Sequence, residues 1–204
     1  MYKYETELLL KGYRKIAGTD EVGRGPLAGP LVCAAVILNP NIMIEGLNDS
    51  KKLSEKKREF LFDEIKKKSL AYSIVYIDEA TIDDINVYQA SKKGMLKAID
   101  TLPVKADFIL SDAMPLGAMP HQSIIKGDSK SASIAAASIL AKVERDRYMV
   151  KIAEKYPEYG FEKHKGYPTK LHIEALNKYG VLDIHRKTYK PVFDKLNEQI
   201  VLDI

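Results

Sequence analysis

Apolar runs mark the strands of this chain. We predict strands at Ile16–Thr19, Leu31–Leu38, Ala71–Ile77, Asp107–Asp112 and His121–Asp128. The run Leu31–Leu38 is apolar throughout, which is typical of a strand covered on both faces. The pattern therefore predicts an α/β sandwich.

Segments with helical periodicity separate and follow these strands. We predict helices at residues 1–13, Ser54–Ser69, Asp84–Thr101, Ser131–Lys155, Thr169–Tyr179 and Pro191–Val201. Ser54 is a candidate N-cap, and Leu53, Phe60, Leu61 and Ile65 form the predicted apolar stripe of its helix. The first half of Ser131–Lys155 is mostly Ala, Ser and Ile, and such small residues let a helix approach a sheet closely.

The composition is that of an ordinary globular protein. The chain has 204 residues, of which 46% are hydrophobic and 29% charged. We expect a single domain over residues 1–204, with its core at about 14–155 and a helical C-terminal extension at about 156–204. The net charge of +4 and the pI near 8.9 permit nucleic-acid binding without establishing it.

Cysteine usage and hydropathy indicate the compartment. The one cysteine, Cys33, lies in an apolar run, where we expect a small buried side chain. The sequence has neither a signal-peptide pattern at its N-terminus nor an apolar span long enough to cross a bilayer. We therefore expect a soluble, cytoplasmic protein in a reducing environment.

Four carboxylates follow apolar strands in three separate parts of the chain. Asp20 and Glu21, Asp112, and Asp128 each stand where a predicted strand leaves the core. In open α/β sheets, side chains converge at such strand ends. Clustered carboxylates repel one another, and two divalent cations would balance their four negative charges. Oxygen ligands favour Mg²⁺ or Mn²⁺, and two such ions can drive phosphodiester hydrolysis.

Two reservations apply to this cluster. On a regular strand the adjacent residues Asp20 and Glu21 point to opposite faces, so both can face one metal pair only if the strand is distorted locally. Gly23 and Gly25 follow at once, and they would allow a twist at the strand end. For Asp128, which precedes a helix, helix capping is an alternative role.

A glycine-rich turn follows the first acids. Residues Gly23–Ala28 match the dinucleotide-binding pattern G-x-G-x-x-A, but Pro26 and Pro30 lead into another strand instead of a helix. Asp20 and Glu21 would also repel a pyrophosphate. Close approach to a nucleic-acid strand explains the turn better, because its backbone can hydrogen-bond a ribose 2′-hydroxyl and Arg24 can bind a phosphate.

Several segments together resemble the ribonuclease HII family. They are Thr19–Pro30, Asp49–Leu53, Ser111–Asp112, Lys126–Asp128, Ser133–Val143 with Arg145 and Asp146, and Lys165–Thr169. The resemblance covers roughly residues 14 to 190. It implies a ribonuclease H-like fold, with a central mixed sheet flanked by helices. The implied activity is cleavage of the RNA strand of RNA–DNA hybrids, and also cleavage at single ribonucleotides embedded in duplex DNA.

The resemblance also implies roles for individual residues. It assigns Asp20, Glu21, Asp112 and Asp128 to a site for two divalent ions and to catalysis. It assigns Gly23, Arg24 and Gly25 to recognition of the 2′-hydroxyl at the junction, Tyr167 to stacking on the following sugar, and Lys51 and Lys52 to phosphates. Lys165 flanks Tyr167 and adds positive charge there. We expect a monomeric endonuclease that leaves 5′-phosphate and 3′-hydroxyl ends and has no membrane partner.

Other interpretations stay open at this point. Another metal-dependent nuclease on the same fold, either an exonuclease or a junction resolvase, would use the same acids. A non-catalytic hybrid-binding module is a further alternative, although clustered carboxylates would repel phosphate there. Tyr167 is also compatible with a half-buried loop aromatic, and Lys51 and Lys52 with a solvated surface. The four histidines are scattered in the sequence, and we expect them to be structural or surface residues, with a reservation for His164 beside Tyr167.

Overall fold

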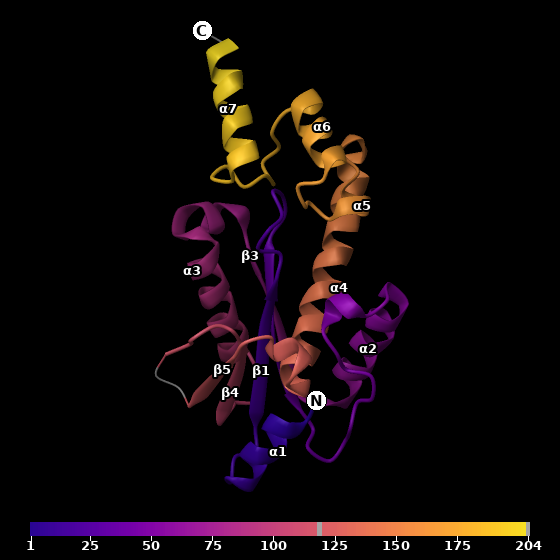
Figure 1. The fold of residues 1–204 in the computed structure, drawn as a ribbon, viewed down its shortest axis with the longest axis vertical. Coiled ribbons are helices and arrows are strands. Elements are labelled where there is room, and N and C mark those ends of the chain that lie inside the picture. Colours follow the sequence, from indigo (N-terminus) through magenta and orange to yellow (C-terminus); the bar gives the residue numbers. More distant parts are fainter. Residues whose placement is uncertain (118–119, 203–204) are drawn as a thin grey trace. The chain divides into compact units, whose positions relative to one another are not determined.

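A computed structural model describes residues 1–117 and 120–202 of the chain (Figure 1). The chain divides into two compact units. The first, here called the sheet unit, comprises Met1–Val22, Val32–Tyr76 and Ser91–Val143. The second, called the helical unit, comprises Gly23–Leu31, Ile77–Ala90 and Glu144–Ile204.

A five-stranded mixed sheet forms the centre of the sheet unit. Its strands are β1 (Ile16–Val22), β2 (Leu31–Leu38), β3 (Ser69–Ile77), β4 (Phe108–Asp112) and β5 (His121–Ile124), in the order β3-β2-β1-β4-β5. β1 pairs antiparallel with β2 and parallel with β4, and β4 pairs parallel with β5. The predicted α/β fold with a central mixed sheet flanked by helices is confirmed.

Seven α-helices and three short 3-10 helices complete the described part of the chain. The α-helices are α1 (Lys3–Leu10), α2 (Glu55–Lys68), α3 (Glu79–Asp100), α4 (Ala132–Lys155), α5 (Phe161–His164), α6 (Lys170–Tyr179) and α7 (Lys190–Leu202). The 3-10 helices are η1 (Ser50–Lys52), η2 (Gly127–Ser129) and η3 (Pro157–Tyr159). The predicted cap at Ser54 is confirmed, because its side chain accepts a hydrogen bond from the Lys57 N–H at 3.3 Å.

Strand β2 is buried at all eight positions because helices cover both faces of the sheet (Figure 1). Val32, Ala34 and Val36 pack in one apolar cluster with residues of α2 and α4. Cys33 points to the other face, where its Sγ lies 3.8 Å from the Ser91 carbonyl oxygen of α3. The prediction that Cys33 is a small buried side chain is confirmed.

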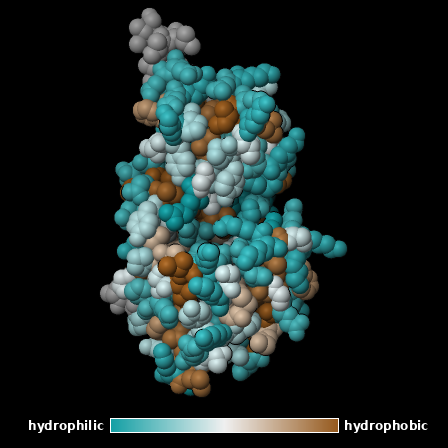
Figure 2. Space-filling model, viewed as in Figure 1, coloured by the Kyte–Doolittle hydropathy of each residue, from teal (hydrophilic) through white to brown (hydrophobic). Residues whose placement is uncertain are grey.

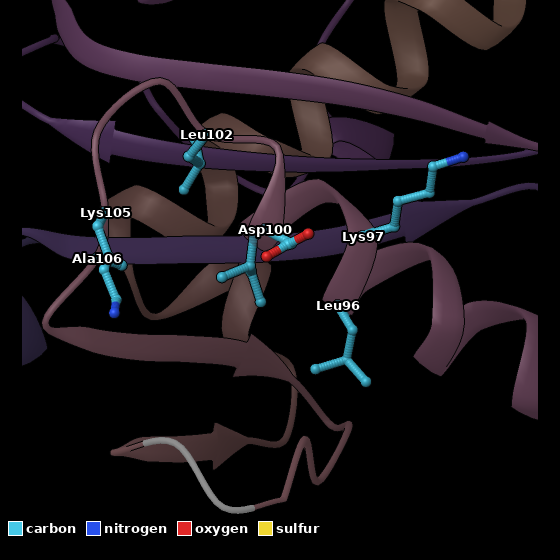
Figure 3. A pocket seen from close by; sticks show the side chains of 7 residues that line it. Leu96, Lys97, Asp100, Leu102, Lys105 and Ala106 are labelled. Atoms are coloured by element: carbon cyan, nitrogen blue, oxygen red, sulfur yellow. The ribbon is translucent and has the colours of Figure 1, made fainter.

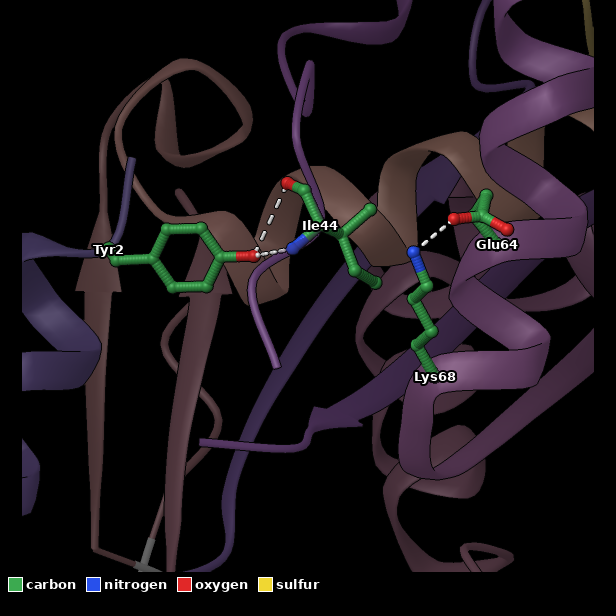
Figure 4. Close-up of polar contacts among 4 residues, drawn as sticks. All are labelled: Tyr2, Ile44, Glu64 and Lys68. Carbon is green, nitrogen blue, oxygen red and sulfur yellow. Dashed lines mark hydrogen bonds and ion pairs between the residues drawn. The ribbon is translucent and has the colours of Figure 1, made fainter. Parts of the chain in front are cut away.

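Polar contacts join the N-terminal residues to other parts of the sheet unit. The Tyr2 hydroxyl accepts a hydrogen bond from the Ile44 N–H at 2.8 Å (Figure 4). Figure 4 also shows the ion pair between Lys68 and Glu64 along α2. The buried Glu5 carboxylate accepts hydrogen bonds from the Ser133 N–H and Oγ at 2.9 and 2.6 Å, and so caps α4 from outside the helix.

Two predicted strand boundaries are wrong, both beside the predicted acids. The strand predicted at His121–Asp128 ends at Ile124, and Asp128 lies in η2. The reason is local, because Lys126 has φ 57° and turns the chain out of the extended conformation. At the other place, β1 continues past Thr19 and includes Asp20, Glu21 and Val22.

The helical unit has two apolar clusters of its own. One contains Met149 and Ala153 of α4 with Phe161 and Ala175, and the other joins Leu27 to residues of α6 and α7. α5 was not predicted, since a four-residue helix leaves no periodicity to detect. Among residues 1–117 and 120–202, no helix is both long and apolar enough to span a bilayer. The face shown in Figure 2 is mostly hydrophilic, with apolar residues in separate small areas.

Close contact between β1 and α4 depends on Gly18. A Cβ added there would lie 2.1 Å from the backbone carbonyl carbon of Ser133. We expect Gly18→Ala to lower the free energy of unfolding by about 3 kcal/mol, because backbone must move to admit the methyl group. Denaturant unfolding measures the loss.

The matched control for this prediction is Gly12→Ala. Gly12 has φ +99° and no atom within 4 Å of the added Cβ, so only backbone strain is introduced, which costs about 1 kcal/mol. Equal losses in the two variants would contradict the close approach of β1 to α4.

Candidate active site

The pairing of β1 with β4 brings two of the predicted acids together. Thr19 is the register partner of Ser111 in this parallel pair, so the following residues, Asp20 and Asp112, occupy neighbouring positions on the same face. Asp20 is 5% exposed. Its carboxylate is oriented by two contacts. Its Oδ1 accepts a hydrogen bond from the Glu21 N–H at 2.8 Å, and the Ser138 hydroxyl of α4 hydrogen-bonds the side chain.

Asp128 reaches Asp112 through the backbone of η2. The Gly127 N–H donates a hydrogen bond of 2.6 Å to Asp112 Oδ1, which places the next residue, Asp128, beside this acid. A side chain at position 127 would collide with Ile134 of α4, 2.6 Å from an added Cβ. Gly127 therefore lets this turn pass close to both α4 and Asp112.

Glu21 lies on the other face of the sheet. It is the cross-strand partner of Cys33, whereas Asp20 is paired with Ala34. Strand β1 stays regular through Val22, so the local twist expected from Gly23 and Gly25 does not occur within the strand. The charge of Glu21 still acts on Asp20.

The electrostatics of this site are those of clustered like charges. Burial, followed by the charges of Glu21 and Asp112, raises the pKa of Asp20 well above its ordinary value. Burial, followed by the charges of Asp49 and Asp112, raises the pKa of Asp128. Asp49 is an acid to which the sequence analysis gave no role, and it also caps η1 by accepting a hydrogen bond from the Lys51 N–H at 2.9 Å.

The donor set fits a hard divalent cation. Within the described residues, no three Asp, Glu, His or Cys side chains are arranged as a ready metal-binding group. The acids approach one another in pairs instead, Asp20 with Glu21 and Asp112, and Asp128 with Asp112. The available ligands are carboxylate oxygens whose mutual repulsion a cation relieves, which is the chemistry that suits Mg²⁺ or Mn²⁺.

Of the two predicted phosphate-binding lysines, Lys51 acts on this cluster. It lies in η1, and its positive charge lowers the pKa of Asp128. Ser50, beside it, is buried and contacts Ser138 with the two hydroxyls 3.0 Å apart. Lys52, the next residue, is exposed at the end of η1.

A groove elsewhere in the sheet unit contains none of these acids. It has a volume of about 810 Å³ and is lined by Leu96, Lys97, Ile99, Asp100, Leu102, Lys105 and Ala106 (Figure 3). Figure 3 shows the Lys97 side chain extending along the groove away from the Asp100 carboxylate. The groove is therefore separate from the carboxylate cluster.

Two buried arginines hold the glycine turn of the helical unit. Arg186 donates hydrogen bonds to the carbonyl oxygens of Gly23 and Arg24 at 2.6 and 3.0 Å, and also to that of Gly29. Arg145 donates to the carbonyl oxygen of Pro30 at 3.0 Å. Further bonds from Arg145 reach the carbonyl oxygens of Ala28 and Lys165.

These guanidinium groups are fully buried. Burial, then the charge of Arg186, lowers the pKa of Arg145 to about 10. Sequence analysis missed both roles, since an arginine in a helix or loop is usually exposed and its carbonyl partners are distant in sequence.

Tyr167 lies over the glycine turn. An added Cβ at Gly25 would be 3.5 Å from Cε1 of the Tyr167 ring, which is 39% exposed. The Arg145 guanidinium lies 5.9 Å from the centre of the same ring. The Leu27 N–H donates to the Gly166 carbonyl oxygen at 2.8 Å, so the turn and the tyrosine loop are joined directly.

The predicted basic residue Lys165 has a constrained backbone. Its φ of 52° is unusual for a residue with a side chain, and its ammonium group hydrogen-bonds the Glu162 carbonyl oxygen. Lys165 therefore shapes the turn that leads to Gly166 and Tyr167.

Three of the four histidines, scattered in the sequence, lie together in the fold, while His121 lies on β5. His164, His172 and His185 lie together in the helical unit, with His172 Nε2 and His185 Nε2 3.1 Å apart. Their sequence spacing gave no sign of this, because they come from different turns of the chain.

Comparisons with known proteins agree with the architecture. The model of the family Ribonuclease HII matches residues 17–194. A ribonuclease HII of Halalkalibacterium halodurans is 54% identical over 193 residues, covering 94% of this chain and 73% of its own. One from Bacillus cereus is 56% identical over 199 residues, covering 97% and 77%.

A solved structure extends the similarity to three dimensions. The ribonuclease H2 of Pyrococcus horikoshii has a TM-score of 0.77 and 28% identity, and the match covers 90% of this chain and 98% of that one. The resemblance inferred from the motifs is confirmed. The chain belongs to the ribonuclease HII family and is a ribonuclease H, an enzyme that hydrolyses RNA in RNA–DNA hybrids.

Proposed function

We propose that this ribonuclease H is an endonuclease that also cuts at single ribonucleotides in duplex DNA and leaves 5′-phosphate and 3′-hydroxyl ends. The observation that supports the cleavage chemistry is the register of β1 and β4, which sets Asp20 beside Asp112, together with the Gly127 N–H that links Asp112 to η2. Acids from three segments thus gather at one edge of the sheet.

Asp20, Asp112 and Asp128 would hold two divalent ions, Mg²⁺ or Mn²⁺. Glu21, whose charge already acts on Asp20, would join them by turning its side chain around the end of β1. Bound there, such ions would supply Lewis-acid activation of the phosphodiester and of water. The chain's own groups keep the ligands in place. The Ser138 hydroxyl and the Glu21 N–H orient Asp20, and the Gly127 N–H orients Asp112.

Lys51 and Lys52 would bind backbone phosphates beside the acids. Support comes from the influence of the Lys51 charge on Asp128, because that interaction requires the two side chains to be near each other. The cap that Asp49 forms on η1 fixes the backbone from which both lysines project.

The glycine turn and Tyr167 would recognise the ribonucleotide. Arg186 already occupies the carbonyl oxygens of Gly23 and Arg24, so the groups of this turn proposed to meet a 2′-hydroxyl are backbone N–H donors. Gly25 keeps the turn thin beneath the Tyr167 ring, which would stack on the neighbouring deoxyribose. Arg24 would bind the adjoining phosphate.

Cleavage mapping on an end-blocked duplex with one ribonucleotide tests the proposed function. An endonuclease cuts this duplex once, beside the ribonucleotide, whereas an exonuclease needs a free end. We expect Asp112→Asn to lower the cleavage rate by at least roughly a hundredfold, because an amide is a poorer cation ligand than a carboxylate. Asp63→Asn is the matched control, since Asp63 is an exposed acid on α2. Wild-type rates for Asp112→Asn would refute the role of this acid.

A second prediction concerns stability without metal. The pKa of Asp20 is raised in the folded chain. The folded state therefore resists ionisation of Asp20, and the free energy of unfolding falls as the pH rises from the unfolded-state pKa, about 4, to the higher folded-state pKa. Asp20→Asn cannot ionise, and we expect it to raise the free energy of unfolding at pH 8 in chelator by roughly 1 kcal/mol.

Metal titration completes this test. Mg²⁺ or Mn²⁺ is expected to raise the melting temperature of the wild type and of Asp63→Asn, and to raise that of Asp20→Asn much less. The same metal-induced shift in all three proteins would mean that the ions bind elsewhere.

A third prediction separates recognition from cleavage. We expect Tyr167→Ala to lower kcat/KM on the single-ribonucleotide duplex about tenfold more than on a uniform hybrid, because loss of stacking costs roughly 1–3 kcal/mol. Tyr88→Ala, at a comparably exposed tyrosine of the helical unit, is the control. Equal losses on both substrates would contradict junction recognition by Tyr167.

A further inference from the structure

Three buried imidazoles lie directly behind Tyr167. His172 and His185 are 0% and 1% exposed, and His164 is 7% exposed. The rings of His164 and His172 are stacked, with their centres 4.6 Å apart. Phe161 contacts all three rings, so the cluster has an apolar wall.

The backbone partners fix the direction of every hydrogen bond in this cluster. The Leu182 N–H donates to His185 Nδ1 at 2.9 Å, so the proton of His185 is on Nε2. His185 Nε2 therefore donates to His172 Nε2, 3.1 Å away. His172 Nδ1 then carries its proton and donates to the Tyr167 carbonyl oxygen at 3.0 Å. The result is a one-way relay from Leu182 through two imidazoles to Tyr167.

His164 has an equally defined role on the other side of the loop. Its Nδ1 accepts from the Gly166 N–H at 3.2 Å, and its Nε2 donates to the Tyr159 carbonyl oxygen at 2.9 Å. The polar backbone groups on both sides of Tyr167, the Gly166 N–H and the Tyr167 carbonyl, are thus bonded to neutral imidazoles.

The relay requires neutral rings. A proton added to His172 Nε2 would set two N–H groups against each other. Burial lowers the pKa of His172 and the pKa of His185 to about 4, which keeps both rings neutral at physiological pH. The other titratable groups acting on these rings are His164 on His172, and Glu162 and Lys165 on His164.

The same relay is anchored to the glycine turn. His185 forms a β-bridge with Ala28, and the next residue, Arg186, donates its N–H to the Leu27 carbonyl oxygen at 2.8 Å. The backbone that positions the imidazoles is therefore the backbone that pairs with the turn beneath Tyr167.

We propose that His172 and His185 are positioning residues for ribonucleotide recognition. Through their chain of hydrogen bonds they hold the Tyr167 loop, residues 165–169, in a fixed position over the glycine turn. This inference rests on the proposed role of Tyr167 in recognising the junction. A purely structural role would require only ring-sized bulk in the cluster. A positioning role requires a donor aimed at the Tyr167 carbonyl oxygen.

A double-mutant cycle distinguishes these two roles. The readout is the ratio of kcat/KM on a single-ribonucleotide duplex to kcat/KM on a uniform hybrid, measured with the full chain. We expect His172→Leu, which fills space without a donor, to lower this ratio about tenfold. His172→Asn retains a donor at the Nδ1 position and is expected to stay within about twofold of the wild type. In a Tyr167→Ala background, His172→Leu is expected to change the ratio less than about twofold, because its effect passes through Tyr167.

Each outcome decides between the alternatives. If Tyr167→Ala lowers the ratio but His172→Leu leaves it unchanged, or lowers it equally in both backgrounds, the positioning role is refuted while the proposed function stands. If Tyr167→Ala itself leaves the ratio unchanged, the proposed junction recognition fails, and the relay's role in it fails too. Should His172→Leu not fold, His172→Phe keeps ring-sized bulk without a donor to the Tyr167 carbonyl oxygen, and the same loss of the ratio is expected; an unchanged ratio refutes the proposal.

Discussion

The parallel pairing of β1 with β4 is the constraint on which the carboxylate site depends. Residues at the same register of two parallel strands point to the same face of the sheet. The pairing of β1 with β4 therefore holds the side chains of Asp20 and Asp112 close together. The sheet therefore holds like charges together that would separate in a flexible chain. The turn of η2 adds Asp128 through the Gly127 N–H. Apolar packing of β2 and α4 supplies the rigidity that resists this repulsion.

The helical unit meets a different constraint, which is to hold a mostly buried turn whose tip, Arg24 and Gly25, stays exposed. Two fully buried guanidinium groups accomplish this by donating to the carbonyl oxygens of the glycine turn. Arginine suits the task, because its planar fork serves several carbonyls at once and its charge survives burial. The imidazole relay does the same for the Tyr167 loop with neutral donors. The proposed recognition of a substrate by this backbone would thus rely on buried side chains that hold the backbone in place.

The sequence predicted the elements that have a strong local signal. The continuous apolar run of β2 specified a covered strand, and the Ala-rich start of α4 specified a helix close to the sheet. Gly18 of β1 accounts for the approach of α4. Features without a local signal were missed. Lys126 adopts a left-handed conformation that its residue type does not favour, α5 is too short to show a helical period, and the partners of Arg145 lie in distant segments. The histidine cluster also lacks a local signal, since its members lie in separate segments: His164 in α5, His172 in α6 and His185 after α6.

Both units bury like charges, and stability alone gives no reason for either arrangement. Asp20 is repelled by Glu21 and Asp112, while burial lowers the pKa of both arginines and the charge of Arg186 lowers that of Arg145 further. A buried charge costs several kcal/mol unless other groups compensate for it. For the arginines, the compensation is internal, since backbone carbonyls accept their hydrogen bonds. For the acids, the described hydrogen bonds from Ser138, Glu21 and Gly127 orient the carboxylates without cancelling their charge. Mg²⁺ or Mn²⁺ at the proposed site would supply further compensation, so the repulsion among the acids is what favours cation binding at this edge of the sheet.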